Sequence, residues 1–168
     1  MKLVNLSTVV VRRVVTSILV AFIFAVALPQ IAFAQVDPVI GTWKLNVAKS
    51  KFAPGPSLQS MTIRYEVAGQ AIRNNFEGID GEGKPVKGTF TIIADGKYYP
   101  VTGVPDFDSS AYKRVDAYTL ENTRMKAGKV VQSGSRVMAR DGRTLTFTAR
   151  GVNAKGQQIN DVVVYDKQ

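Results

Sequence analysis

From residue 41 onward, apolar and polar side chains alternate along the chain in short segments. The alternation is clearest over residues 43–47, 61–67 and 144–149, where every second side chain is apolar or small. A period of two predicts β-strands with one buried face and one solvated face. Weaker segments of the same kind predict further strands at residues 71–79, 86–94, 97–101, 110–116, 117–124, 130–139 and 158–166.

Short breaks rich in Gly, Asp and Asn separate these segments. Gly supplies the positive φ that tight hairpin turns need, and Asp and Asn tolerate it. The pattern predicts an all-β fold, an antiparallel up-and-down meander of about 8–10 strands that is closed or nearly closed into a barrel. Helical periodicity is absent, except that residues 47–52 could form one turn before Pro54 and Pro56 stop it. Two longer connections, at residues 48–60 and 100–110, are where binding residues tend to lie.

Residues 1–34 have a different character. Lys2, Arg12 and Arg13 are followed by a long apolar stretch, and Ala32-Phe33-Ala34 supplies a small-x-small ending. This pattern predicts a secretory signal helix that is cleaved between Ala34 and Gln35. The alternative is an uncleaved anchor, because residues 14–36 carry no charge and are long enough to cross a bilayer. Cleavage leaves residues 35–168 as one exported domain, periplasmic or secreted, without a membrane span.

The leader holds 3 of the 22 basic residues and none of the 13 acidic ones, so the remaining chain has a net charge of 19 − 13 = +6. The basic residues are scattered, which favours solubility over binding to nucleic acid. The chain has no Cys and no His. Disulfides, Ser-His-Asp and Cys-His catalysis, and His or Cys zinc sites are therefore excluded. No cofactor or metal is expected, and the oligomeric state is left open.

The segment Gly41-Thr42-Trp43 resembles the start of the first strand in the lipocalin and wider calycin superfamily. Longer strings, "GTWKLNVAKSKF", "DGKYYPVTG" and "NDVVVYDKQ", resemble a group of small exported bacterial proteins described only as lipocalin-like. The resemblance implies a calycin-like barrel in which Gly41 and Trp43 are structural and Trp43 packs at the closed end. In lipocalins an Arg of the last barrel strand covers that Trp. Here Lys167, or Arg150 from the preceding strand, would have to replace it.

"GTWKLN" also resembles the opening of intracellular fatty-acid-binding proteins, but two of their features are missing. A short proline-bearing loop stands where they have a two-helix lid. Val163-Val164-Tyr165 stands where they carry Arg-x-Tyr. A fatty-acid anchor of that type is therefore not expected.

Candidate pocket residues are the aromatic side chains that lie on different strands and could meet in one interior. They are Tyr65, Phe76, Phe90, Tyr98, Tyr112, Phe147 and Tyr165. The alternative is a packed core without a cavity. An inward-facing arginine would be an anion anchor, and the arginines considered are Arg64, Arg73, Arg114 and Arg136.

Asp106 and Asp108 form the best acidic pair, which could bind calcium or act as an acid and a base. The alternative is that they are ordinary turn residues after Pro105.

Three functions remain. The first is non-catalytic binding of a small hydrophobic or amphipathic molecule in the barrel. The second is an envelope-associated structural or interaction protein with a packed core and a basic surface. The third is a hydrolase or isomerase that uses Asp and Tyr, disfavoured because the commonest nucleophile–base pairs are missing.

Overall fold

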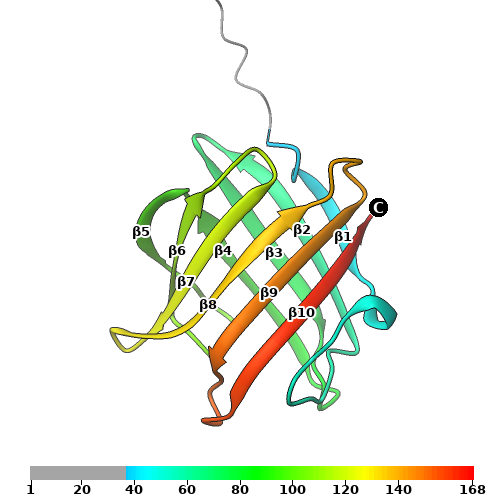
Figure 1. The fold of residues 1–168 in the computed structure, drawn as a ribbon, viewed down its shortest axis with the longest axis vertical. Coiled ribbons are helices and arrows are strands. Elements are labelled where there is room, and N and C mark those ends of the chain that lie inside the picture. The colour runs from blue at the N-terminus through cyan, green and yellow to red at the C-terminus, as the bar shows by residue number, and fades with distance from the viewer. Residues whose placement is uncertain (1–36) are drawn as a thin grey trace, which may run out of the picture. The chain divides into compact units, whose positions relative to one another are not determined.

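The structure, a computed structural model, describes residues 37–168, which form a ten-stranded β-barrel (Figure 1). The elements are β1 (Gly41–Leu45), a 3₁₀ turn η1 (Val47–Lys49), β2 (Ser60–Ala68), β3 (Ala71–Ile79), β4 (Pro85–Ile92), β5 (Asp95–Pro100), β6 (Ser109–Arg114), β7 (Thr119–Lys126), β8 (Lys129–Met138), β9 (Thr144–Val152) and β10 (Gln158–Lys167). The predicted leader and its cleavage positions, Ala34 and Gln35, lie outside the described residues. Nothing helical in the described part of the chain is long and apolar enough to cross a membrane.

All ten strands belong to one antiparallel sheet, in the order β4-β3-β2-β1-β10-β9-β8-β7-β6-β5. Each strand pairs with its sequence neighbour, except that β1 and β10 pair across the two ends of the domain and β4 and β5 are the edges. The predicted all-β meander in a nearly closed barrel is confirmed. Its ten strands fall in the ten segments that alternate in polarity.

The barrel comes closest to closing at the seam between β4 and β5. An isolated bridge joins Phe90 to Val101, and the Thr102 hydroxyl donates to the Thr89 carbonyl at 3.1 Å. Two glycines permit this approach. A Cβ on Gly88 would collide with the Thr102 carbonyl, and one on Gly103, whose φ is +80°, would collide with the Lys87 carbonyl. Backbone contact therefore replaces a regular ladder at the seam.

One end of the barrel is densely packed around Trp43, which has no exposed surface. Its indole N–H donates to the Val39 carbonyl at 2.7 Å, and Leu145 is likewise fully buried in the same cluster. The ammonium of Lys167 lies 5.2 Å from the centre of the indole ring, so Lys167 is the cation that covers the tryptophan. Arg150 instead donates to Asn160 at 3.1 Å, away from Trp43.

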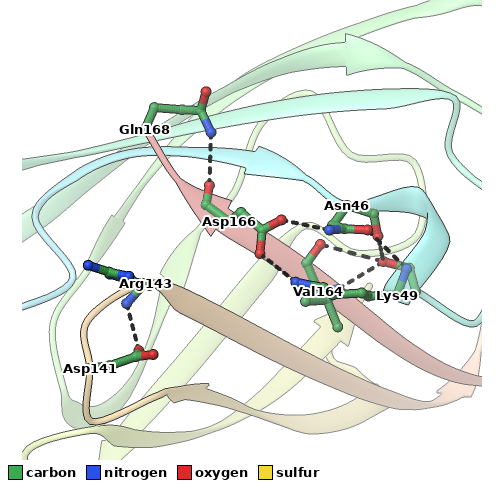
Figure 2. A network of polar contacts seen from close by, with 8 residues as sticks. Asn46, Lys49, Asp141, Arg143, Val164, Asp166 and Gln168 are labelled. Carbon is green, nitrogen blue, oxygen red and sulfur yellow. Dashed lines mark hydrogen bonds and ion pairs between the residues drawn. The ribbon is translucent and has the colours of Figure 1, made fainter.

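A polar cluster ties β1 to β10 just after the first strand (Figure 2). Asn46 caps the 3₁₀ turn by accepting from the Lys49 N–H, and its amide donates to Asp166 at 2.6 Å. The Lys49 ammonium contacts the same carboxylate at 3.2 Å. The Asn46 hydrogen bond, with help from Lys49, lowers the pKa of Asp166. The single turn predicted within residues 47–52 is thus present, and the chain then extends along β10.

Candidate functional site

The candidate site is a cavity of about 340 Å³ in the barrel interior, at the end away from Trp43. Aromatic and aliphatic side chains form most of its wall, with two amides and three charged groups among them. The lining consists of Phe52, Pro56, Leu58, Met61, Ile63, Asn74, Phe76, Phe90, Val104, Asp106, Phe107, Tyr112, Arg124, Gln132, Phe147, Ala149, Ile159, Asp161, Val163 and Tyr165. Volume and composition are those of pockets that hold small ligands, which span roughly 300–1,000 Å³.

Aromatic rings from opposite parts of the sheet build the cavity wall. Phe90 of β4 stacks with Tyr112 of β6, with ring centres 6.3 Å apart and planes within 8° of each other. Phe76 of β3 lies 6.3 Å from Phe90 in a tilted arrangement. Phe147 and Tyr165 meet edge to face at 5.5 Å between ring centres. These contacts fix the rings to one another and give the cavity a rigid apolar wall.

Arg124 of β7 is the only cation among the lining residues, and its guanidinium is already engaged. It donates to the Gln132 side-chain carbonyl at 2.8 Å and lies 4.7 Å from the centre of the Phe107 ring. With its amide oriented to satisfy its neighbours, Asn122 accepts from the Arg124 Nε–H at 3.1 Å. Gln132 in turn donates to the Val152 carbonyl at 3.2 Å. The network holds the guanidinium against one side of the cavity.

Two carboxylates lie in the lining and fix the loops at the open end. Asp161 of β10 accepts from the Ala53 N–H at 2.9 Å, which ties down the β1–β2 connection. Asp106 accepts from the Ala154 N–H at 2.8 Å, which ties the β5–β6 connection to the β9–β10 turn. Burial, and then the charge of Asp106, raise the pKa of Asp161 despite the Ala53 hydrogen bond and Arg124.

Outside the cavity lining, a cluster of ion pairs joins two turns at the open end of the barrel. Glu82 in the β3–β4 turn pairs with Lys155 in the β9–β10 turn and with Lys84 at 2.9 Å. The hydrogen bonds from Lys155 and Lys84 lower the pKa of Glu82 to about 2. All three side chains are well exposed, so the pairs orient the turns more than they stabilise the fold.

Four buried polar atoms have no hydrogen-bond partner within residues 37–168: Tyr65 Oη, Asn74 Oδ1, Ser110 Oγ and Arg136 Nη1. Three of the four lie on inward-facing sides of β2, β3 and β8, where Arg136 also sits 5.2 Å from the centre of the Tyr65 ring. Burial raises the pKa of the Tyr65 hydroxyl to about 12, so it is neutral at physiological pH. Asn74 alone among the four lines the cavity. Buried polar groups usually have partners, so these atoms mark the polar part of the interior.

The structure brings five of the seven predicted pocket aromatics together. Phe76, Phe90, Tyr112, Phe147 and Tyr165 line the cavity.

The other two predicted pocket aromatics lie elsewhere. Tyr65 is 1% exposed and belongs to the packed cluster behind the cavity wall. Tyr98 is 41% exposed, and its hydroxyl contacts the Thr123 hydroxyl at 2.9 Å, so the expectation that it faces the interior is corrected. The physical reason is a register irregularity between Asp95 and Tyr98, which breaks the simple alternation along β5.

The four arginines considered in the sequence also separate. Arg136 is 4% exposed and faces inward, whereas Arg64 and Arg73 are exposed. Arg114 pairs with Asp37 at 2.6 Å, and Arg136 lies 4.0 Å from the same carboxylate. The inward arginine therefore sits toward the packed end, and it is absent from the cavity lining.

Asp106 and Asp108 do not converge. Asp106 lines the cavity, whereas Asp108 is exposed and accepts from the Ala127 N–H at 2.8 Å, in the β7–β8 turn. Successive side chains of an extended segment need not share a neighbourhood, and here a buried Phe107 lies between them. Within residues 37–168, no three acidic side chains gather as a metal site would require.

A larger hollow of about 640 Å³ lies on the outside of the sheet over β6 to β9. Its rim is formed mainly by outward-facing polar residues, among them Lys113, Glu121, Ser135 and Arg150. Sheet curvature is enough to produce such a depression. It lacks the apolar wall of the interior cavity, which is therefore the candidate site.

Sequence reasoning missed four polar residues of the cavity: Asn74, Arg124, Gln132 and Asp161. The available signal was alternation, because Arg124 stands two and four residues after the buried Asn122 and Leu120. Asp161 likewise stands two and four residues before Val163 and Tyr165 on β10. In the sequence alone, a polar residue at an inward position looks like a member of the solvated face.

No protein-family profile matches the chain, and no curated protein matches it in sequence. Solved structures do resemble it. Apo lipid binding protein 8 of Caenorhabditis elegans superposes with a TM-score of 0.51 at 16% identity, covering 82% of this chain and all of the other. Zebrafish ileal bile acid-binding protein in complex with cholic acid gives 0.43 at 12% identity, covering 78% and 98%. The first of these likenesses supports the fold, a nearly closed antiparallel barrel of ten strands.

Proposed function

We propose that this protein binds a small hydrophobic or amphipathic molecule inside its barrel and performs no chemistry on it. The observation that carries the proposal is the cavity of about 340 Å³ with a mainly aromatic and aliphatic wall. A core evolved only for stability would be filled, because voids forfeit packing contacts and cost roughly 24 cal/mol per Å³ in a well-studied series. The lipid and bile acid named for the similar structures are compatible with this kind of ligand.

The arrangement of polar groups also favours binding over catalysis. Asp106 and Asp161 are both committed to backbone N–H groups of neighbouring loops, and Arg124 is committed to Gln132. Groups fixed in this way orient a bound molecule. The Asp106–Asp108 pair, on which the catalytic alternative rested, is divided between the cavity and an outer turn.

We further propose that the protein is exported, periplasmic or secreted, and related to the small bacterial lipocalin-like group. The basic start, the apolar stretch and the Ala32-Phe33-Ala34 ending support export, and the "GTWKLN", "DGKYYPVTG" and "NDVVVYDKQ" strings support the relation. Intact-mass measurement of the exported protein tests it. A mass beginning at Gln35 is expected, and retention of the full chain in the cell would contradict it.

The alternative of an interaction protein with a packed core loses its main premise, because the interior contains a cavity. Its other premise, the net charge of +6 after the leader, remains a property of the surface. Salt-sensitive retention on anionic envelope polymers, with no ligand bound, is the result that would favour it.

Two measurements test ligand binding. Native mass spectrometry of the protein purified from its own source should show a co-purifying molecule. Titration with N-phenyl-1-naphthylamine, an uncharged fluorescent probe, should give saturable enhancement of fluorescence. No adduct together with no enhancement would refute the proposal.

A matched pair of variants on β9 locates the binding. Ala149→Phe adds bulk inside the cavity, and we expect it to weaken probe binding about tenfold or more. Thr146→Phe adds an aromatic ring on the same strand three residues earlier, at a position of opposite parity that is absent from the cavity lining, and should leave binding unchanged. Equal effects of the two variants would place the probe outside the barrel.

A further inference from the structure

The charge inside the cavity is opposite in sign to that of the protein. The lining contains two carboxylates, Asp106 and Asp161, and one guanidinium, that of Arg124, so its formal balance is negative. The whole chain, by contrast, has a formal net charge of +9. A basic protein with two carboxylates in the lining of an apolar cavity does not select an anionic ligand by charge.

The single cation of the lining is poorly placed to receive an anion. Its Nη1 donates to Gln132, its Nε–H is accepted by Asn122, and its plane lies over Phe107. No ion pair within 4.0 Å joins Arg124 to either cavity carboxylate in the part of the chain that the structure describes. Each of the two carboxylates, Asp106 and Asp161, therefore accepts one backbone N–H and keeps further acceptor capacity.

A second observation, independent of the carboxylates, also indicates that the cavity needs a hydrogen-bond donor from its ligand. The side chain of Asn74, 3% exposed, lines the cavity from β3, and within residues 37–168 its Oδ1 has no hydrogen-bond donor. The cavity lining therefore includes acceptors with free capacity from β3, β10 and the β5–β6 connection. A buried acceptor such as Asn74 Oδ1 needs a donor, and two carboxylates in one cavity favour a donor that carries positive charge.

Resting on the proposed function, we infer that the preferred ligand is an amphiphile with a cationic, hydrogen-bond-donating head, such as a long-chain primary amine. Its apolar chain lies against the aromatic wall of Phe90, Tyr112 and Phe147. Its ammonium group is held between the carboxylates of Asp106 and Asp161. A fatty acid of equal length would place its carboxylate against the same two groups and is rejected by like-charge repulsion.

The test is competition for the uncharged naphthylamine probe by three ligands that share one chain: dodecylamine, dodecanol and dodecanoic acid, at pH 7 and below their aggregation concentrations. We expect the amine to displace the probe at a concentration about tenfold or more below that of the acid, with the alcohol between them. An acid that competes as well as the amine, or better, overturns the inference. A probe that fails to bind, together with no co-purifying molecule in native mass spectrometry, overturns the proposed function itself, so the two failures are distinct.

A matched set of variants assigns the preference to the cavity carboxylates. Asp106→Asn with Asp161→Asn removes both charges and keeps an oxygen for the Ala53 and Ala154 N–H groups, so the amine should lose its advantage over the alcohol. Asp141→Asn is the control, because Asp141 accepts from the Arg143 N–H at 2.9 Å in the β8–β9 turn, outside the cavity (Figure 2). Persistence of the preference in the double variant, with the circular dichroism spectrum unchanged, refutes the role of the carboxylates. The wild-type ranking of the three ligands stands as a test without any variant.

Discussion

The two ends of the barrel are built from the same strands and have opposite character. At the packed end, Trp43 and Leu145 are fully buried, the indole N–H has a partner, and Lys167 covers the ring. At the open end, the same strands surround a cavity, and loops are fixed by Asp106 and Asp161. β10 takes part in both: Lys167 covers Trp43 at the packed end, whereas Asp161 lines the cavity at the open end.

The packed end of the barrel supplies stability, and the open end of the same strands supplies the binding cavity. Dense packing at one end supplies the free energy of folding, because buried apolar area contributes roughly 25 cal/mol per Å². The other end can then keep unfilled volume and unpaired acceptors such as Asn74 Oδ1, which both cost stability. Truncations should therefore destabilise the packed end more, and substitutions that remove polar groups should affect binding at the open end.

The largest expected effect is at Trp43. Trp43→Ala should lower the free energy of unfolding by about 3–5 kcal/mol, because it removes a fully buried side chain and leaves a cavity. Phe52→Ala, at the partly exposed mouth, should cost less than about 1.5 kcal/mol. Urea denaturation followed by circular dichroism measures both. Equal costs would contradict the division between the two ends.

The seam between β4 and β5 should respond next. Gly103→Ala forces a Cβ against the Lys87 backbone at a φ of +80°, and we expect a loss of roughly 1–3 kcal/mol in the free energy of unfolding. Gly96→Ala is the control, because Gly96 has a similar φ of +79° but no atom near its Cβ. Thermal unfolding of the two variants separates backbone strain from collision. A Gly103 variant no worse than the Gly96 variant would show that the seam is loose.

Asn74→Leu tests the cost of polarity in the cavity. Replacing a buried amide whose oxygen lacks a partner should raise the free energy of unfolding by about 1 kcal/mol. The same change should weaken displacement of the probe by dodecylamine, because it removes an acceptor from the cavity. Urea denaturation and probe competition on one sample check both. A destabilised variant would mean that the Asn74 amide supports the fold.

The smallest effect concerns Asp161 and its dependence on pH. Its pKa in the folded protein is raised above the usual 3.8 by burial and by Asp106, with Arg124 opposing, so the folded state binds the proton more tightly. The contribution of Asp161 to stability therefore falls as pH rises from about 3.8 through the raised pKa, and Asp161→Asn removes this contribution.

The Asp161 variant should consequently be more stable than the wild type at pH 7, by less than about 1 kcal/mol because solvent screens the partly exposed carboxylate. The advantage should vanish at pH 3. Denaturation midpoints measured at both pH values give the answer. An advantage that grows toward low pH would have the wrong sign and would refute the assignment.

The fold was largely predictable, because period-two alternation and hairpin turns are local signals. The ten segments expected from alternation correspond to the ten observed strands, and Trp43 lies in the packed core. The site was only partly predictable. Tyr98 faces outward because a register irregularity in β5 interrupts the alternation. Arg124 and Asp161 line the cavity because of their positions along their strands, which polar side chains do not reveal in the sequence.

By itself, the sequence determined that residues 37–168 form an antiparallel meander with Trp43 in its first strand, since polarity and turn chemistry act between near neighbours. The tertiary structure alone decided which strand pair forms the seam, where packing leaves a cavity, and which polar side chains share it. Asn74, Asp106, Arg124 and Asp161 come from four separate segments. Only closure of the sheet brings them together, because distances between side chains so far apart in sequence are set by the curvature and register of the whole barrel.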